Sequence, residues 1–439
     1  MGRARKFAAG RLGGFRPRPP KKAPDMNAAR EDVYALVRRN VAAVRENTAI
    51  RPAIAGFAAF VVAWIASHGR STPYNNYALL ADAILHGHLW INWPGESTSD
   101  ALPWGGLHYV IEAPMPAILM LPFAIFWNDH ANQTFMALIL CGFAVGITYA
   151  LLQRLDVRPW PAFWLTLFFF AGTDLWWCAQ LGDVWFIAHV SAVLFTMLAL
   201  YELTGRHRGW LVALFAVCAF ESRFSMIMAV PFYAYCVARG GLLLPEPLRL
   251  SRLRSFALVL AGAAVFWVGY NELRWGLPYD IGYTAWYHHD SWGQKDGSPF
   301  RLSYFPYEFY SFFMRPPALV EWMQQAQAPF FKVDVNGIAL TFSSPALILA
   351  FWSKAPRTLK IALWITIALV AAPSFFYYLN GWYQYGMRHA LDFEPFLLIL
   401  MAFAVRERVP RWGQALIAYS VLMSVWGIWY WNSTYRSGD

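Results

Sequence analysis

Long uninterrupted apolar segments are the feature that most restricts how this chain can fold. A helix needs about 20 apolar residues to cross a hydrocarbon core of ~30 Å, with a range of roughly 17–25. Of the 439 residues, 58% are hydrophobic and only 14% are charged, whereas soluble domains average about 25% charged residues. The pattern predicts an all-α polytopic membrane protein. The clear candidate spans are residues 53–69, 132–152, 159–178, 184–203, 255–271, 359–379, 389–405 and 412–431.

Three further apolar segments are ambiguous, and the basic residues decide how each is interpreted. Residues 114–128 are short and carry three prolines, so we expect them to lie flat on the outer face or to form a re-entrant segment there. Residues 209–238 are too long for one span, and Glu221 and Arg223 in their middle predict a hairpin, while residues 338–353 supply one more span. This arrangement puts fourteen Lys and Arg residues in short inner connectors, as the positive-inside rule requires. It predicts about eleven transmembrane helices, with the N-terminus inside and the C-terminus outside.

The charge distribution divides the chain into residues 1–50, a basic tail, and residues 51–439, the transmembrane domain. Thirteen of the 36 Lys and Arg residues precede the first apolar segment, and the net charge is +10. Anionic lipid attracts basic tails beside a membrane by about 1 kcal/mol per charge. We therefore expect a cytoplasmic tail in contact with membrane lipid, and no nucleic acid as a partner.

Two long outer loops, residues 70–131 and 272–342, contrast with the short inner connectors. Loops longer than about 12–15 residues are usually functional. The sequence therefore indicates a function on the outer side of the membrane.

The first outer loop carries an amphipathic stretch and the candidate acids. At helical spacing Asn75, Asp82 and His86 share one stripe, and an apolar face is formed by Tyr77, Leu80, Ala81 and Ile84. The two faces predict a juxtamembrane helix whose polar side faces a cavity or simply solvent. Glu112 lies at the edge of an apolar segment, where partial desolvation suits a general base. The candidate bases are Asp100 first, then Asp82 and Glu112. Candidate binding residues in this loop are Asn75, Asn76, His86 and His108.

Arg223 and Arg388 lie near the outer ends of predicted spans, where ionisable residues are functional candidates. A guanidinium can bind two phosphate oxygens at once. We therefore expect both arginines to converge on one outward cavity and to bind phosphate. The alternative is internal ion pairs, with Glu221 for Arg223 and Asp392 for Arg388.

No metal or cofactor is expected. The sequence contains no CxxC pair and none of the motifs for nucleotide hydrolysis or zinc proteolysis. Adjacent residues of an extended chain point in opposite directions, so the run His288-His289-Asp290 does not indicate a metal site.

Three motifs, taken in order, resemble those of the GT-C superfamily, which are polytopic glycosyltransferases that use polyprenyl-phosphate sugar donors. Residues 75–87 are similar to the bacterial pattern "NxYxxLAxAxLxGxL". Residues 270–283 are similar to "YNxxRFGxPxxxGY" of uncharacterised bacterial members, and residues 386–392 to "GxRYxLD". The resemblance covers nearly all of residues 53–431, and the predicted topology is also that of the protein O-mannosyltransferases.

The resemblance implies an inverting transferase in a bacterial cytoplasmic (inner) membrane. It would move a sugar from a polyprenyl-phosphate-linked donor to a glycan, lipid or protein acceptor of the cell envelope. A loop acid would deprotonate the acceptor, Arg223 and Arg388 would bind the departing phosphate, and Tyr283 would contact substrate. The chain departs from the family at Asn75 and Asn76, where most members have acidic residues that act as base. Two other functions stay open: a transporter or flippase for a lipid-linked substrate, and a non-catalytic assembly protein.

Overall fold

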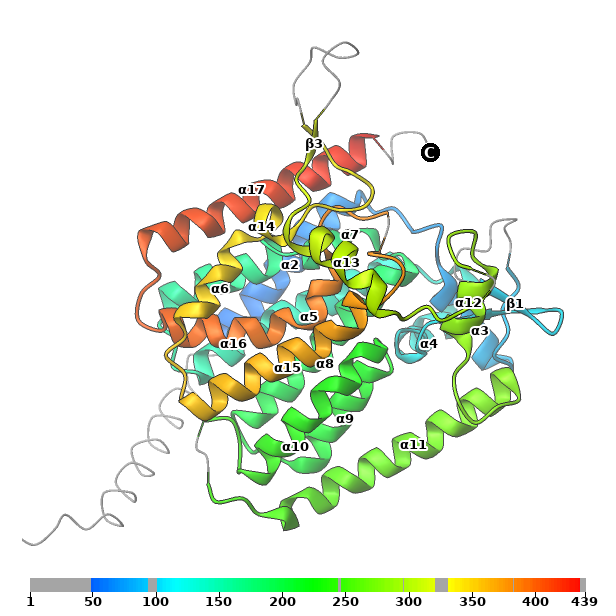
Figure 1. The fold of residues 1–439 in the computed structure, drawn as a ribbon, viewed down its shortest axis with the longest axis horizontal. Helices are drawn as coiled ribbons and strands as arrows, with labels where there is room; N and C mark the ends of the chain where they lie inside the picture. The colour runs from blue at the N-terminus through cyan, green and yellow to red at the C-terminus, as the bar shows by residue number, and fades with distance from the viewer. Residues whose placement is uncertain are drawn as a thin grey trace, which may run out of the picture. The chain divides into compact units, whose positions relative to one another are not determined.

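The computed structural model describes residues 49–93, 101–243, 246–294, 296–319, 331–381 and 383–434. This part of the chain is mostly helical (Figure 1), as expected, and it also contains two small antiparallel hairpins. The α-helices are α2 (Ile50–Ser67), α3 (Asn76–Leu85), α4 (Met115–Trp127), α5 (Gln133–Arg154), α6 (Pro159–Ala171), α7 (Leu175–Leu181), α8 (Val184–Leu203), α9 (Gly209–Phe220), α10 (Val230–Ala238), α11 (Leu253–Trp275), α12 (Gly282–His289), α13 (Phe305–Phe313), α14 (Leu340–Ser343), α15 (Arg357–Phe375), α16 (Glu394–Val405) and α17 (Arg411–Thr434). The 3₁₀ helices are η2 (Asn128–His130), η3 (Phe224–Ala229), η4 (Leu250–Arg252), η5 (Leu302–Tyr304), η6 (Pro345–Trp352) and η7 (Arg388–Asp392). The strands are β1 (Ala101–Trp104), β2 (Leu107–Val110), β3 (Ala318–Leu319) and β4 (Phe331–Lys332).

Five helical segments are long and apolar enough to cross a membrane: α2, α5, α8, η4 with α11, and α15. The helices α6 and α7 form a sixth candidate that is bent by 47° at the break between them. All six coincide with spans predicted from the sequence. The structure therefore has several helices suited to a membrane, as the apolar segments indicated.

The ambiguous segment 209–238 reverses direction, as its central charges predict. Its two ends come back together, because the amide of Leu242 donates to the carbonyl of Leu203 at 3.0 Å. Gly209 also lies against Val237, where an added Cβ would be 3.2 Å from a side-chain methyl. The reversal falls between α9 and η3, at Glu221 to Arg223.

Inner connectors predicted from their basic residues contact one another. The amide of Arg158 donates to the carbonyl of Arg406 at 3.0 Å, and the Arg158 guanidinium lies 2.6 Å from Glu407. The guanidinium of Arg154 donates to the carbonyl of Tyr201 at 2.8 Å. These contacts join connectors that follow different helices at one end of the bundle.

The long loops meet at the other end. The guanidinium of Arg274 in the second loop donates to the carbonyl of Val110 in the first at 2.9 Å. Near the start of the first loop, the Thr72 hydroxyl donates to Asp183, between α7 and α8, at 2.5 Å. The basic connectors and the long loops therefore lie at opposite ends of the helical bundle.

Small residues let α2 and α5 pack closely. An added Cβ at Gly56 would lie 2.5 Å from the carbonyl oxygen of Gly142 and 3.3 Å from Gly146. Contacts of this kind join helices where burial of apolar area supplies little attraction. Of the candidate spans α8 is the most buried and α11 the most exposed, and Figure 1 shows α11 at the margin of the helices.

The first loop folds onto the helices through α3 and α4, which pack against each other. Tyr77, Leu80 and Ala81, the expected apolar face of α3, are fully buried. The helix α4 has 13 residues, which is about 20 Å at 1.5 Å per residue and too short to cross a membrane. Its length fits the expectation that residues 114–128 lie along a surface.

Candidate functional site

Arg223 and Asp392 form a buried ion pair at the end of the bundle where the long loops meet. The Nη2 atom of Arg223 lies 3.1 Å from Oδ2 of Asp392, and its Nε atom lies 3.3 Å from both carboxylate oxygens. Arg223 occupies the reversal after α9, and Asp392 ends η7 just before α16. An internal ion pair was the alternative that the sequence left open for Arg223, but the partner is Asp392 and not Glu221.

Two further side chains complete the contacts of Asp392. The Ser225 hydroxyl donates to Oδ2 at 2.5 Å, and Nδ1 of His189 lies 3.0 Å from Oδ1. With its oxygens occupied, this carboxylate orients Arg223 and does not serve as a base. The Nη1 atom of Arg223 has no hydrogen-bond partner among the described residues, and 17% of the side chain is exposed. One edge of the guanidinium is therefore free to bind an anion.

Glu112 is held close to this ion pair by backbone contacts on either side of it. Two residues earlier, the carbonyl of Val110 accepts from Arg274 at 2.9 Å. Three residues later, the amide of Met115 donates to the carbonyl of Glu221 at 2.8 Å. The Glu112 side chain itself is buried. These contacts fix the position of Glu112 relative to the surrounding helices, although it belongs to a loop.

Two tyrosines lie within electrostatic range of Arg223, and one of them, Tyr77, is also within range of Glu112. The Tyr77 hydroxyl is within electrostatic range of Glu112, Tyr283 and Arg223. Burial raises the pKa of Tyr77, and the charge of Glu112 raises it further, so the phenol is a neutral hydrogen-bond donor at physiological pH. The Tyr283 ring lies 5.5 Å from that of Phe224, the neighbour of Arg223. We call this group the Arg223 centre, and it comprises Arg223, Asp392, His189, Ser225, Tyr77, Tyr283 and Glu112.

Arg274 joins the segments that carry Glu112 and Tyr283. Besides Val110, its guanidinium donates to Asn271 at 3.0 Å and to Asp280 at 2.7 Å. The indole of Trp275 also donates to Asp280, at 3.1 Å. Burial raises the pKa of Asp280, while the charge of Arg274 acts to lower it. Arg274 is 3% exposed, so its role is to fix other groups rather than to meet substrate.

Arg388 lies near the Arg223 centre but is held by a different set of groups. It donates to the carbonyl of Gly381, and its Nη1 lies 3.4 Å from Oε1 of Gln384. Arg223 and Arg388 both act electrostatically on His189 and His389, whose rings lie 5.4 Å apart. The structure thus brings the two arginines to the same region, 165 positions apart in sequence, but it buries Arg388.

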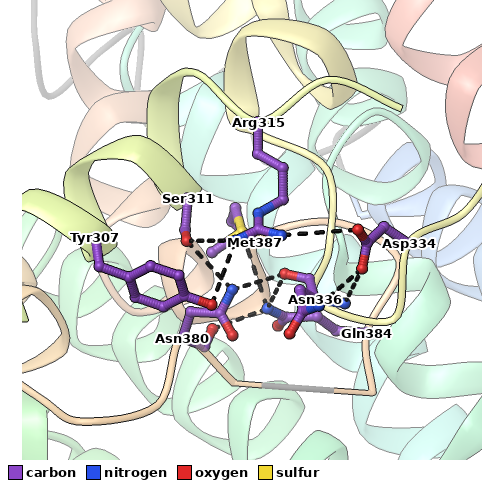
Figure 2. A network of polar contacts seen from close by, with 8 residues as sticks. All are labelled: Tyr307, Ser311, Arg315, Asp334, Asn336, Asn380, Gln384 and Met387. Carbon is purple, nitrogen blue, oxygen red and sulfur yellow. Dashed lines mark hydrogen bonds and ion pairs between the residues drawn. The ribbon is translucent and has the colours of Figure 1, made fainter. Parts of the chain in front are cut away.

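A polar network ties the second outer loop to the segment before Arg388, as Figure 2 shows. Arg315 lies 3.7 Å from Asp334, which accepts from the side chain of Asn336 at 2.9 Å. The carbonyl of Asn336 in turn accepts from Asn380 at 2.8 Å and from Gln384 at 3.3 Å. Because Gln384 also contacts Arg388, the network links the loop to the site.

The remaining predicted residues of the first loop lie outside the Arg223 centre. Asp82 on α3 lies 3.5 Å from His86, the residue that follows the helix, and Asn75 contacts the carbonyl of Asp129 at 3.4 Å. Asn76 is fully buried at the start of α3, and His108 is half-buried in β2. Asp100 lies outside the described residues.

Sequence reasoning missed the parts of the site that depend on distant contacts. Tyr77 was assigned to the apolar face of a helix, and a tyrosine in that position gives no sign of a polar partner. Arg274 stood in a recognised motif without a role. The neighbouring Asn271 and Asp280, which can both accept from a guanidinium, are the signal that could have identified it as a structural link.

The chemistry available at the Arg223 centre is that of a carboxylate beside an oriented guanidinium. A buried Glu can accept a proton, and an Arg with one free edge can bind an oxyanion. Within the described ranges, no cluster of three or more His, Cys, Asp and Glu side chains is arranged to hold a metal ion. Comparisons with protein-family models, curated proteins and solved structures find no match.

Proposed function

We propose that the chain is a membrane glycosyltransferase that moves a sugar from a polyprenyl-phosphate donor to an acceptor on the outer face of the membrane. The observation that carries the proposal is the Arg223 guanidinium, which Asp392 fixes along one edge and leaves free along the other, with Glu112 nearby. Displacement of a phosphate requires a group that accepts a proton, here Glu112, and a group that binds the departing anion, here Arg223. The resemblance of three motifs to the GT-C superfamily supports the same reaction.

In this mechanism Glu112 takes the proton of the acceptor hydroxyl. The acceptor oxygen forms a bond to the anomeric carbon from the face opposite the phosphate, and the bond between that carbon and the phosphate oxygen breaks. The electron pair of the broken bond stays on the polyprenyl phosphate, which leaves as an anion. Arg223 binds this anion through its free edge, while Tyr283 donates a hydrogen bond to a substrate oxygen. Removing a donor that stabilises such charge typically costs ~2.7–4 kcal/mol.

The proposal includes a topology. The eleven segments would be the six candidate spans together with α9, η3 with α10, α14 with η6, η7 with α16, and α17. The inner position of the basic connectors follows from the positive-inside rule, and it puts the Arg223 centre at the outer face of a bacterial inner membrane. The grouping of the long loops at one end supports this arrangement.

The test is a transfer assay with purified protein in liposomes and a panel of radiolabelled polyprenyl-phosphate sugars. The acceptor is added outside the liposomes and cannot cross the bilayer. We expect labelled product and an equal amount of polyprenyl phosphate. Replacing Arg223 by Lys keeps one charge but loses the planar fork, and should lower turnover at least tenfold while donor is still bound. Labelled donor that crosses the bilayer without transfer would assign the chain to the flippase class.

A non-catalytic assembly protein would neither transfer nor move the donor. If no donor in the panel is used for transfer, and the Arg223 variant binds envelope partners as well as the wild type does, the chain is a non-catalytic assembly protein and not an enzyme. A labelled product identifies the transferase, donor that has crossed the bilayer identifies the flippase, and binding of envelope partners alone identifies the assembly protein.

A further inference from the structure

A hollow of about 440 Å³ lies in the outer loops between the β1–β2 hairpin and α12. Its volume falls in the range of small-molecule sites, ~300–1,000 Å³. One wall comes from β1 and the other from α12. The lining residues are Leu102, Pro103, Trp104, Ile281, Thr284, Ala285, His288 and His289.

The hollow and the Arg223 centre use two different faces of α12. Ile281, Thr284, Ala285 and His288 recur at the three- and four-residue spacing of one helix face, and this face lines the hollow. Tyr283 lies on another side, where its ring is 6.0 Å from that of Tyr377. The hollow is therefore next to the Arg223 centre and separated from it by a single helix.

The base of α12 is also fixed directly to the segment that carries Glu112. An added Cβ at Gly282 would lie 3.3 Å from the carbonyl oxygen of Ile111. A glycine is needed at this position because the helix approaches that backbone so closely. The position of a ligand in the hollow would thus be fixed relative to Ile111, the residue next to Glu112.

The polar groups of the lining come from Trp104, Thr284, His288 and His289. Within the described part of the chain, no hydrogen bond is recorded for the hydroxyl of Thr284, the indole nitrogen of Trp104 or the ring nitrogens of His289. Nε2 of His288 lies 3.2 Å from the carbonyl of Gly297, which leaves its other nitrogen. No Lys, Arg, Asp or Glu lines the hollow, so neither an anion nor a metal ion finds its counter-charge there.

The aromatic wall completes the description of the ligand. Trp104 is 40% exposed, and its ring is supported edge-on by Trp275 at 6.1 Å. A saccharide has flat C–H faces that pack on an indole and a rim of hydroxyls that exchange hydrogen bonds with Thr and His side chains. A hydrocarbon chain would use the ring but leave the polar groups unpaired, at a cost for each.

We infer that this hollow binds a neutral saccharide, the glycan of the acceptor. The inference rests on the proposed transferase function and adds to it the class and position of the second substrate. Trp104 would stack on a sugar ring, and Thr284 and His289 would bind its hydroxyls. The acceptor would then reach Glu112 past the first turn of α12.

Saturation-transfer-difference NMR on the full chain in lipid nanodiscs tests the inference, with neutral methyl glycosides and short oligosaccharides as probes and no glycoside detergent. We expect transfer to ring C–H protons for at least one probe, reduced at least tenfold by Trp104→Ala and reduced by Thr284→Val. Trp292→Ala is the matched control, because Trp292 is 71% exposed in the same loop and does not line the hollow. Equal signals in wild type and both lining variants, or no signal with any probe, would overturn the inference.

Further arms separate this inference from its alternatives. Glu112→Gln should lower transfer and leave saccharide binding intact. Wild-type protein that binds the saccharide but transfers no sugar counts only against the transferase. Transfer that is unaffected by Trp104→Ala and Thr284→Val counts only against the hollow. If brominated lipid quenches Trp104 and glycosides do not displace the quenching, the hollow belongs to the lipid interface and the saccharide is excluded. Should Trp104→Ala fail to fold, Thr284→Val and His289→Ala carry the test.

Discussion

The Nη2 atom of Arg223 lies 3.1 Å from Oδ2 of Asp392, although the residues stand 169 positions apart in sequence. The contact joins the turn after α9 to the start of α16. Burying either charge alone would be costly, so each side chain fixes the other. Because Asp392 contacts only the Nε and Nη2 atoms of Arg223, the same contact that stabilises the fold also fixes the orientation of the guanidinium.

Replacing Asp392 by Asn should destabilise the protein by about 3–5 kcal/mol, since it leaves Arg223 as an uncompensated buried charge. The free energy can be measured by unfolding in mixed SDS–detergent micelles. Asp174→Asn is the matched control, because both carboxylate oxygens of Asp174 lack a hydrogen-bond partner among the described residues. Equal losses in the two variants would mean that the ion pair contributes nothing specific.

Replacing Glu112 by Gln should lower transfer by about 10²–10⁴-fold, the usual contribution of a general base. Asp82→Asn should change it little, because Asp82 pairs with His86 away from the Arg223 centre. Asp100→Asn completes the comparison of the acids that the sequence nominates. Initial rates at saturating donor decide among them. A larger loss in Asp100→Asn than in Glu112→Gln would move the base to that residue.

Replacing Arg274 by Lys should loosen the segment before Glu112. A single ammonium cannot reproduce simultaneous contacts to Val110, Asn271 and Asp280 in the geometry of a guanidinium. Faster hydrogen exchange in residues 101–113 and lower turnover are the expected results. Arg301→Lys is the control, because the guanidinium of Arg301 donates to Gln294 and to the carbonyl of Asp296, which are both nearby in sequence. Unchanged exchange in both variants would contradict the positioning role of Arg274.

Glu308 in α13 should make stability depend on pH. Burial raises its pKa from 4.5 to about 8, although the charge of Arg315 acts to lower it. The folded state therefore binds a proton that the unfolded state loses above pH 4.5. Stability should fall as pH rises from 4.5 to about 8 and then level off. Melting temperatures of wild type and Glu308→Gln test this, and the prediction fails if the variant keeps the same slope.

Labelling single cysteines in a background without Cys141, Cys178, Cys218 and Cys236 tests the orientation. An impermeant thiol reagent should label His130→Cys in intact cells, because this side chain is 90% exposed at the loop end of the bundle. Leu250→Cys, 68% exposed at the connector end, should react only after permeabilisation. Labelling with the opposite preference would invert the proposed topology and put the Arg223 centre inside.

The helical class was accessible from sequence because the length of an apolar segment is a local property. The reversal at Glu221 to Arg223 was accessible for a similar reason, since charges in an apolar run mark a turn. The β1–β2 hairpin also had a local signal: Gly105 and Gly106, both with positive φ, are the residues that a tight hairpin turn prefers. The prediction of an all-α protein passed over it.

The site was only partly accessible. Glu112 and Arg223 were nominated by residue type and position, and Tyr283 by the family resemblance. The alternative of an internal ion pair named Glu221 for Arg223, because a sequence suggests near neighbours, whereas the fold selects Asp392. Long-range pairing of this kind depends on how helices pack, and no local pattern encodes it.

The span between Arg223 and Asp392 also affects how the protein is made. Both arms of the hairpin leave the ribosome and can enter the membrane long before Asp392 is synthesised. During that interval the guanidinium has no counter-charge from η7, and Glu112 already lies in the part of the chain that has been translated. Only synthesis of η7 supplies the carboxylate, so a nascent chain that ends before Asp392 lacks the ion pair of the Arg223 centre. The ion pair thereby forms late in the synthesis of the chain.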